Sequence, residues 1–313
     1  MKKAIPAVLA LGLLALPIAC AKFNPPTSPT ALPHFYLSQW GSQGNGNGQF
    51  SSLSGIATDS SGNVYVVDSG NNRIEKFTGT GAYITQWGAS GNGNGQFSDP
   101  SNIALDSSGN VYVVDLINSR IEKFTGTGAY VTQWGTSGNG NGEFNLPNGI
   151  SADTTGNIYV VDAGNSRVQK FTSTGAYLAQ WGSYGNANGQ FSGPDGIAVD
   201  SADNVYVVDA TNNNVQKFTN SGAFICQWGG YGSGNGNLSN PSCGICVDSN
   251  GVVYVADSGN SRIEEFTDTG AYITQWGNTG PGALTFPDFL CLSPSGKIYV
   301  TDSNTIKIFA AYP

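Results

Sequence analysis

The chain has 313 residues, including 44 Gly and 14 Pro, and 11% of its residues are aromatic. This aromatic content is too high for a disordered chain and is sufficient for a buried core, so we expect one all-β domain of ordinary size. Charged residues make up only 11% of the chain and leave a formal net charge of −8. An acidic surface poor in arginine does not attract phosphate backbones, which argues against nucleic acid as a partner.

Residues 1–21 have the features of an export signal. Two lysines precede the apolar run AIPAVLALGLLAL, which is too short to span a bilayer comfortably. The next residues, LPIAC, resemble a bacterial lipobox in which Cys20 would be lipidated, although Pro17 replaces an aliphatic residue of that pattern. Cleavage after Ala21 is the alternative. We predict an exported protein that is lipid-anchored to a bacterial membrane through Cys20, or periplasmic or secreted and soluble in the alternative.

Residues 22–33 are rich in Pro, Thr and Ser and suit a semi-rigid spacer between a membrane and a domain. From residue 34 to residue 313 the chain repeats itself. The dipeptide Trp-Gly recurs at intervals of 47, 47, 47, 47 and 48 residues. Each unit contains four short apolar runs like NIALD, NVYVVD, RIEKF and AYVTQWG, separated by turn sequences. These runs are rich in β-branched and aromatic residues, so each unit is predicted to form four strands.

Four antiparallel strands in a unit of about 40–50 residues are typical of a β-propeller blade. The first Trp-Gly precedes the first complete unit, and the last unit ends without one. We therefore predict an all-β, six-bladed β-propeller with four-stranded antiparallel blades. Residues 34–41 would supply the outer strand of the last blade and close the ring, which leaves no free sheet edge at the seam.

The motifs GIAVD, NVYVVD, NSRVQKF and WG resemble the NHL repeat, and the resemblance extends from Leu37 to Phe309. It implies partner recognition through the face that bears the Gly/Asn-rich loops, as in NHL sensor domains of bacterial membrane kinases. We expect a monomeric, non-catalytic scaffold that binds a protein, peptide or glycan in the cell envelope. Contact with a membrane would occur only through the lipidated N-terminus.

Candidate binding residues are sought where one blade departs from the others, because identical blades present identical surfaces. Leu116 and Ile117 replace Ser-Gly in one loop, and Tyr184 and Tyr231 lie in two of the Gly/Asn-rich loops. Drift among duplicated repeats is the alternative explanation. Three further candidates, Asn148, Asp195 and Asp288, lie at the predicted channel mouth, where the place held by Ser54, Ser101 and Asn148 becomes Asp195 in blade 4 and Asp288 in blade 6.

A repeated arginine after the turn between the second and third strands lies on the same predicted face. These arginines are included among the candidate binding residues, with solvated pairing to a neighbouring Asp as the alternative: Arg73, Arg120, Arg167 and Arg262. The Asp before this turn, such as Asp68, and the Asp of the DSSGN hairpin, such as Asp59, are predicted to cap turns rather than to bind metal.

Several propeller enzymes resemble this fold. The resemblance implies zinc-binding histidines for peptidyl-α-hydroxyglycine α-amidating lyase and a catalytic histidine for virginiamycin B lyase. This chain has one histidine, His34, which lies before the closing strand, so a histidine-based site in the channel is excluded. The gluconolactonase family binds a divalent metal with Glu, Asn and Asp, which Asn148, Asp195 and Asp288 match in part. We predict no catalytic residue, cofactor or metal. The alternatives are a metal-dependent lyase or lactonase with carboxylate ligands in the channel, and a structural surface or matrix component.

Four cysteines lie within the repeats. The CGIC sequence that begins at Cys243 enters a strand rather than a helix, so thiol activation of the usual C-x-x-C kind is not expected. Cys246 and Cys291 hold equivalent places on adjacent inner strands and are the candidates for a disulfide in an oxidising compartment. The alternative is that they are small buried thiols in place of alanine.

Overall fold

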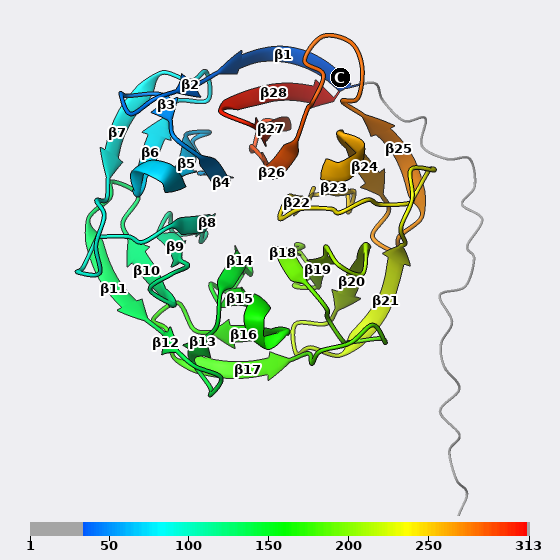
Figure 1. Cartoon of the computed structure of the whole chain (residues 1–313), viewed down its shortest axis with the longest axis horizontal. Coiled ribbons are helices and arrows are strands. Elements are labelled where there is room, and N and C mark those ends of the chain that lie inside the picture. The colour runs from blue at the N-terminus through cyan, green and yellow to red at the C-terminus, as the bar shows by residue number, and fades with distance from the viewer. Residues whose placement is uncertain (1–33, 312–313) are drawn as a thin grey trace, which may run out of the picture.

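The computed structural model describes residues 34–311 and arranges them as six four-stranded antiparallel sheets around a central channel (Figure 1). This confirms the predicted six-bladed β-propeller. The predicted signal peptide, the Cys20 lipidation site and the spacer at 22–33 lie outside the described residues. Between residues 34 and 311, no helix has the length and apolar character needed to cross a bilayer.

Within each blade the chain runs from an inner strand beside the channel outward to a fourth strand at the rim. Blades 1 and 2 comprise β4 (Leu53–Thr58), β5 (Val64–Asp68), β6 (Arg73–Phe77), β7 (Tyr83–Trp87), and β8 (Pro100–Leu105), β9 (Val111–Asp115), β10 (Arg120–Phe124), β11 (Tyr130–Trp134). Blades 3 and 4 comprise β14 (Pro147–Ala152), β15 (Ile158–Asp162), β16 (Arg167–Phe171), β17 (Tyr177–Trp181), and β18 (Pro194–Val199), β19 (Val205–Asp209), β20 (Asn214–Phe218), β21 (Phe224–Gly229). Blade 5 comprises β22 (Ile245–Val247), β23 (Val253–Asp257), β24 (Arg262–Phe266) and β25 (Tyr272–Trp276).

Blade 6 takes its strands from both ends of the described chain. It comprises β26 (Pro287–Leu292), β27 (Lys297–Asp302), β28 (Thr305–Ala311) and, as outer strand, β1 (His34–Trp40). Strand β1 pairs antiparallel with β28 from His34 opposite Ala311 to Trp40 opposite Ile306. The predicted closure of the ring by the N-terminal strand is therefore confirmed, and Figure 1 shows β1 lying along β28.

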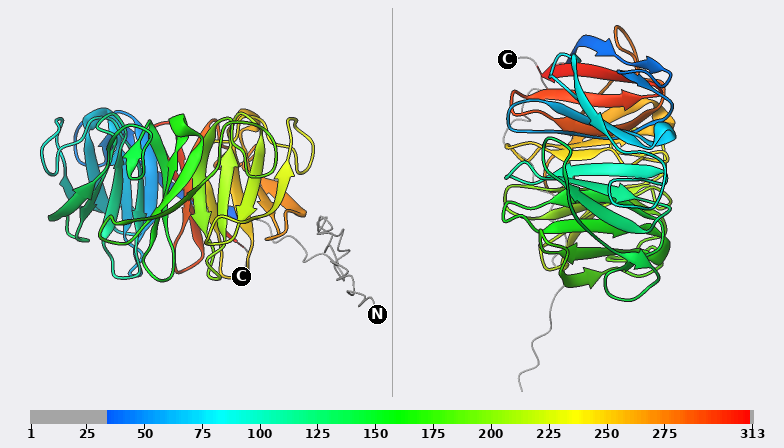
Figure 2. Two further views of the ribbon diagram at one scale, coloured as in Figure 1. Left: turned by 90° about the horizontal axis from the view of Figure 1, so that it is seen from below. Right: turned by 90° about the vertical axis from the view of Figure 1, so that its left-hand side faces the viewer.

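Two faces of the ring differ in their connections, and Figure 2 shows the strands running between them. One face carries the Gly/Asn-rich loops between blades and the loops between second and third strands; we call it the loop face. The other carries the turns that join the first to the second and the third to the fourth strand; we call it the turn face. Short elements on the loop face are β2 (Ser42–Gln43), β3 (Gln49–Phe50), β12 (Thr136–Ser137), β13 (Glu143–Phe144) and the 3-10 turns η1 (Ser69–Asn71), η2 (Ala163–Asn165) and η3 (Ser258–Asn260).

The core lies between blades, since each second strand is covered on both sides. Every residue of β5, including Tyr65 and Val67, is buried. Neighbouring blades also interlock at the rim, where the Trp of one blade packs on a Gly of the next. Gly128 has φ +87°, and a Cβ there would lie 2.6 Å from the Trp87 ring, so this position favours glycine on two counts. Contacts of this kind between a Trp and the turn Gly of the following blade join neighbouring blades at five of the six seams.

The seam between blades 5 and 6 lacks the turn that carries this Gly, because the third strand of blade 6, β28, is not joined by a turn to its outer strand, β1. His34 takes its place and stacks on Trp276, with ring centroids 4.6 Å apart and planes at 15°. Glu265 replaces the lysine that, in blade 1, is Lys76 and donates to the next blade's turn carbonyl. Its Oε1 accepts a hydrogen bond from Trp276 Nε1 at 2.6 Å and lies 3.2 Å from His34 Nδ1.

Burial sets the charges of this seam pair. It raises the pKa of Glu265 to about 7 and lowers the pKa of His34 to about 4. Between pH 4.5 and 6.5 the folded pair therefore holds one proton, on Glu265. The unfolded pair also holds about one, on His34. Equal proton counts mean that the pair gives folding little dependence on pH in this window.

Removing either His34 or Glu265 is expected to make the free energy of unfolding depend on pH through the residue that remains. In Glu265→Gln, His34 alone has a depressed folded pKa, so its contribution is present above pH 6.5 and is lost as the pH falls toward 4. In His34→Asn, Glu265 alone has a raised folded pKa, so its contribution is lost as the pH rises through about 7. Urea unfolding of both variants from pH 4 to 8, each compared with the wild type, measures these opposite slopes. Parallel curves for all three proteins would contradict the pairing.

Candidate functional site

The repeated arginines of the loop face are buried and fully engaged. Arg73 is 7% exposed, and its Nε donates to Asp68 Oδ2 at 2.9 Å. Its Nη atoms donate to the side chain of Gln86 and to the loop carbonyls of Asn45, Gly46 and Gln49. We call this arrangement the arginine cluster of a blade, and it recurs around Arg120, Arg167 and Arg262.

The expectation that these four arginines bind a partner is therefore corrected, because their donors are used to hold the Gly/Asn-rich loops. They are not solvated either. Asp68 also receives the backbone N–H groups of Ser51 and Ser52, so it caps the incoming loop rather than its own turn. Asp59 behaves as predicted and caps its hairpin by accepting from the N–H groups of Ser61 and Asn63.

The blade-specific apolar residues remain available at the surface. Ile117 is 57% exposed, Tyr184 78% and Tyr231 81%, whereas Leu116 is half-buried. Short parallel bridges from Tyr184 to Phe191 and from Tyr231 to Leu238 fix the backbone of both tyrosines, so their side chains project from anchored loops. Such exposed, backbone-fixed aromatic rings are typical anchors of protein interfaces.

Sequence analysis missed two further exposed side chains of the loop face, Leu146 and Phe286, which are 52% and 53% exposed. Both precede the proline of an inner strand, where other blades have Ser52, Asp99, Gly193 or Asn240. Leu146 also has φ +50°, a conformation that a branched aliphatic residue rarely adopts. The change from polar to apolar at this repeat position was the signal that could have identified them.

Leu146 lies beside the loop of Ile117. In the equivalent places of other blades, Asp99 N donates to Asn72 Oδ1 at 2.9 Å and Asn240 N donates to Asn213 Oδ1 at 2.7 Å. The residue before the proline thus contacts the second-to-third-strand loop of the preceding blade. By the same register, Leu146 borders the loop of blade 2 that contains Leu116 and Ile117.

The mouth of the channel on this face is acidic and half-buried. Asn148 Nδ2 donates to Asp195 Oδ1 and, at 3.1 Å, to Cys243 Sγ. Burial raises the pKa of Asp195. Burial and the nearby charge of Asp195 raise the pKa of Asp288 to about 6. The structure therefore joins Asn148 and Asp195 by a hydrogen bond, and Asp288 lies close enough for the charge of Asp195 to raise its pKa.

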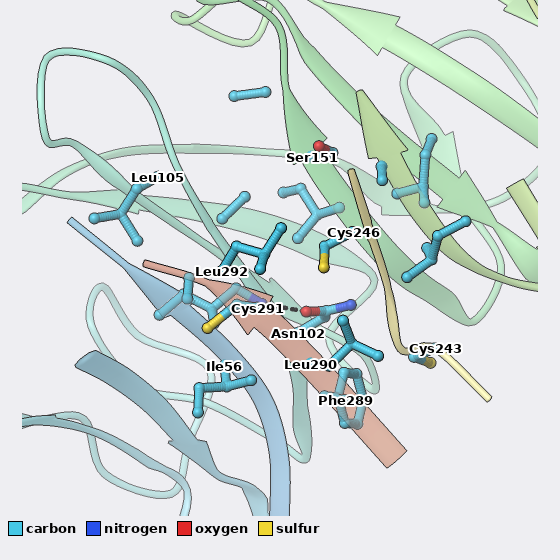
Figure 3. Close-up of a pocket in the computed structure, with 18 of the residues that line it drawn as sticks. Ile56, Asn102, Leu105, Ser151, Cys243, Cys246, Phe289, Leu290, Cys291 and Leu292 are labelled. Atoms are coloured by element: carbon cyan, nitrogen blue, oxygen red, sulfur yellow. Dashed lines mark hydrogen bonds between the residues drawn. The ribbon is translucent and has the colours of Figure 1, made fainter. Parts of the chain in front are cut away.

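Below the mouth, the channel contains a cavity of about 270 Å³ that is lined by the inner strands (Figure 3). Its lining includes Asn102 and Phe289, which stand where the other four blades have glycine, and the inserted residue Cys243. Cys246 and Cys291 also line it and are free thiols, as are Cys226 and Cys243. Cys246 and Cys291, the candidate pair for a disulfide, are therefore not bonded to each other. Burial raises the pKa of both thiols, which keeps them protonated and unreactive.

Metal chemistry at the channel would need several ligands converging. Among residues 34–311, no group of three or more His, Cys, Asp or Glu side chains is arranged to hold a metal ion. At the mouth, Asn148 turns its amide nitrogen toward Asp195, so hydrogen bonding between these side chains accounts for their arrangement.

Comparisons with known proteins agree with the fold. Four segments match the NHL repeat model, residues 50–77, 144–171, 191–218 and 244–266, which fall on blades 1, 3, 4 and 5. No curated protein matches the chain in sequence. A protein of unknown function from Bacteroides thetaiotaomicron has a similar structure, with TM-score 0.69, 17% identity, and coverage of 89% of this chain and 76% of that one.

Two solved enzymes are also similar in structure. Virginiamycin B lyase from Staphylococcus aureus has TM-score 0.61 and 16% identity, over 90% of this chain and 99% of its own. A gluconolactonase from Xanthomonas campestris has TM-score 0.62 and 13% identity, over 85% and 88%. At such identities the likeness concerns the fold alone. This chain carries NHL repeats and folds as a six-bladed β-propeller.

Proposed function

We propose that the protein is an exported, non-catalytic scaffold that binds a protein or peptide partner through the loop face. One observation carries the proposal. The aspartates and arginines that repeat on this face are buried in arginine clusters, whereas the residues that differ between blades, Ile117, Leu146, Tyr184 and Tyr231, are exposed. Exposed apolar and aromatic side chains, held on a rigid frame, are the usual anchors of a binding surface.

Two other functions have an observation in their favour. A metal-dependent lyase or lactonase would use Asn148, Asp195 and Asp288 of the channel mouth, of which Asn148 and Asp195 are in direct contact. A structural matrix component would associate with itself, and the outer strands of five of the six blades expose one aliphatic residue at the rim, at 41–49% exposure in Leu37, Ile84, Val131, Leu178 and Ile225. The loop-face proposal is preferred because its blade-specific residues are exposed, whereas the mouth residues are half-buried and the rim residues recur from blade to blade.

The test compares partners crosslinked in native cells by the wild type and by a double variant, Leu116→Ser and Ile117→Gly. The variant restores the Ser-Gly of blades 1 and 5, so the loop is expected to fold. We expect loss of about tenfold in partner capture, since removing an interface anchor costs at least about 1–2 kcal/mol. Thr127→Ala on the turn face is the matched control.

An unchanged partner set in the double variant would contradict the proposal. Capture of the chain itself as the main product, lost on Leu178→Ser and Ile225→Ser substitution at the rim, would contradict it too and would favour the matrix function.

A further inference from the structure

In every other blade, a cationic side chain lies beside the buried aspartate that ends the second strand. Blade 4 lacks this cation. Blades 1, 2, 3 and 5 use the arginine of the cluster. Blade 6 has Thr305 at that place, but Lys307 binds both Asp302 and the loop carbonyl of Ala283. In blade 4 the place is held by Asn214, and Asp209 is 0% exposed with no ion pair among the described residues.

The groups that surround the arginine in blade 3 are all kept in blade 4. Arg167 bonds to Asp162, to the loop carbonyls of Asn139, Gly140 and Glu143, and to Gln180. The corresponding residues of blade 4 are Asp209, Asn186, Ala187, Gln190 and Gln227. Five oxygen acceptors arranged for a guanidinium are therefore encoded in a blade that has no arginine to fill them.

The loop that supplies these carbonyls has the same internal bonds in both blades. Gln169 Oε1 accepts from Gly142 N at 2.9 Å in blade 3, and Gln216 Oε1 accepts from Gly189 N at 2.8 Å in blade 4. Each glutamine also donates to the loop carbonyl at 2.7 Å. Blade 3 shows that this glutamine and an arginine coexist, so Gln216 does not itself replace the guanidinium.

Asn214 does not satisfy the vacated place. Its side chain is too short to reach the loop carbonyls as an arginine does, and its Oδ1 is buried without a hydrogen-bond partner. Asp209 accepts hydrogen bonds from the backbone N–H groups of Ser192, Gly193 and Asn212 and from the Asn212 amide, but its buried negative charge has no countercharge. A buried charge of this kind and an orphaned amide oxygen are both unfavourable. Together they point to a ligand that brings positive charge and several N–H donors.

We propose that this socket, formed by Asp209, Asn214, Gln227 and the 186–190 loop, receives the guanidinium of an arginine side chain from the bound partner. The inference rests on the loop-face function and names the chemistry of its partner. In blade 3 the Nη1 end of Arg167 meets Asn139 and Gln180, which are both exposed residues, so this end of the socket lies directly beneath the surface.

A second feature places the socket within the loop face. Tyr184 belongs to the same loop as Asn186 and Ala187, and its ring is 78% exposed. Arginine stacks on tyrosine rings, and its planar fork matches carbonyl and carboxylate acceptors better than an ammonium does. The acidic character of the whole chain also favours a basic partner.

The first test measures thermal unfolding of the full chain with ethylguanidinium, ethylammonium or calcium chloride at equal ionic strength. Guanidinium ions also act as denaturants, so Asn214→Arg, which fills the socket from within, serves as the baseline. Wild type relative to Asn214→Arg is expected to gain about 3 °C at roughly tenfold excess of ethylguanidinium over its Kd, and nothing with ethylammonium. Asn214→Arg without ligand is expected to melt above the wild type, whereas Asn214→Gln should not.

Three results would overturn the socket: equal responses of wild type and Asn214→Arg to ethylguanidinium, a lower melting temperature of Asn214→Arg, or protection by calcium in place of ethylguanidinium. The partner provides the second test. Capture by Asn214→Arg is expected to fall about tenfold while the protein stays folded. If Asn214→Arg captures the partner normally and the double variant at Leu116 and Ile117 does not, the socket proposal is wrong and the loop-face function stands.

Discussion

Deletion of residues 35–41 is expected to abolish the cooperative unfolding transition and to make the protein aggregate. Strand β1 completes blade 6 by pairing with β28 along its whole length, and no other described segment can cover that edge. Without it, the backbone groups of β28 and the apolar side chains of Trp276 and Phe309, whose rings lie 4.8 Å from each other, face solvent. Exposed sheet edges of this kind pair with other chains.

Calorimetry and size-exclusion chromatography measure the outcome. A matched control substitutes Phe35→Ser and Leu37→Ser, since these side chains are already 42% and 49% exposed and the backbone pairing is kept. The control is expected to melt within about 3 °C of the wild type, as surface substitutions cost little. A deletion variant with an unchanged melting temperature and unchanged solubility would contradict the closure of the ring by β1.

Replacement of Arg120 by alanine is expected to lower the free energy of unfolding by about 3–5 kcal/mol. The substitution leaves Asp115 and Glu122, both 0% exposed, buried without a countercharge, and releases the loop that Arg120 holds through three carbonyls. Urea unfolding at pH 7 measures the loss.

The chain itself supplies the rescue variant. Arg120→Asn with Glu122→Gln copies the pair that blade 4 carries at Asn214 and Gln216. Because it removes one of the two stranded carboxylates, we expect it to recover about half of the loss. Equal stability of Arg120→Ala and the wild type would mean that the arginine clusters do not hold the loops.

The sequence revealed most of the fold because its period is so regular. The spacing of the tryptophans fixed the number of blades, and the phase of Trp40 against the incomplete last unit fixed the closure by β1. Inside each strand, the repeated turn sequences left little freedom in register. The insertion in blade 5 was also visible, as the 48-residue interval, and the structure places it at Cys243 in the channel lining.

The site was predicted less completely, for physical reasons. Arg73 follows a turn and reads as exposed, but its acceptors are backbone carbonyls 24–28 residues earlier, and backbone groups leave no mark in a sequence. Cys246 and Cys291 were correctly placed on adjacent inner strands, yet strand position does not give the sulfur–sulfur geometry that a disulfide requires. Leu146 and Phe286 were overlooked because an apolar residue before a strand proline resembles core.

Asn214 shows the same limit. Its departure from the repeated arginine is plain in the sequence, whereas the loop carbonyls that would accept an arginine there appear only once the loop of residues 186–190 is built. A substitution inside a repeat is therefore informative mainly through what the other blades do with the same place.

Site-specific photocrosslinking in native cells, from both faces of the ring, tests partner binding through the loop face most directly. A photoreactive phenylalanine would replace Ile117, Tyr184 or Tyr231 on the loop face, and Thr80, Thr127 or Thr174 on the turn face, where each threonine is exposed to solvent. We expect one partner to be crosslinked from all three loop-face positions and from none of the turn-face positions. The same partner captured from the turn face alone, or equally from both, would contradict it.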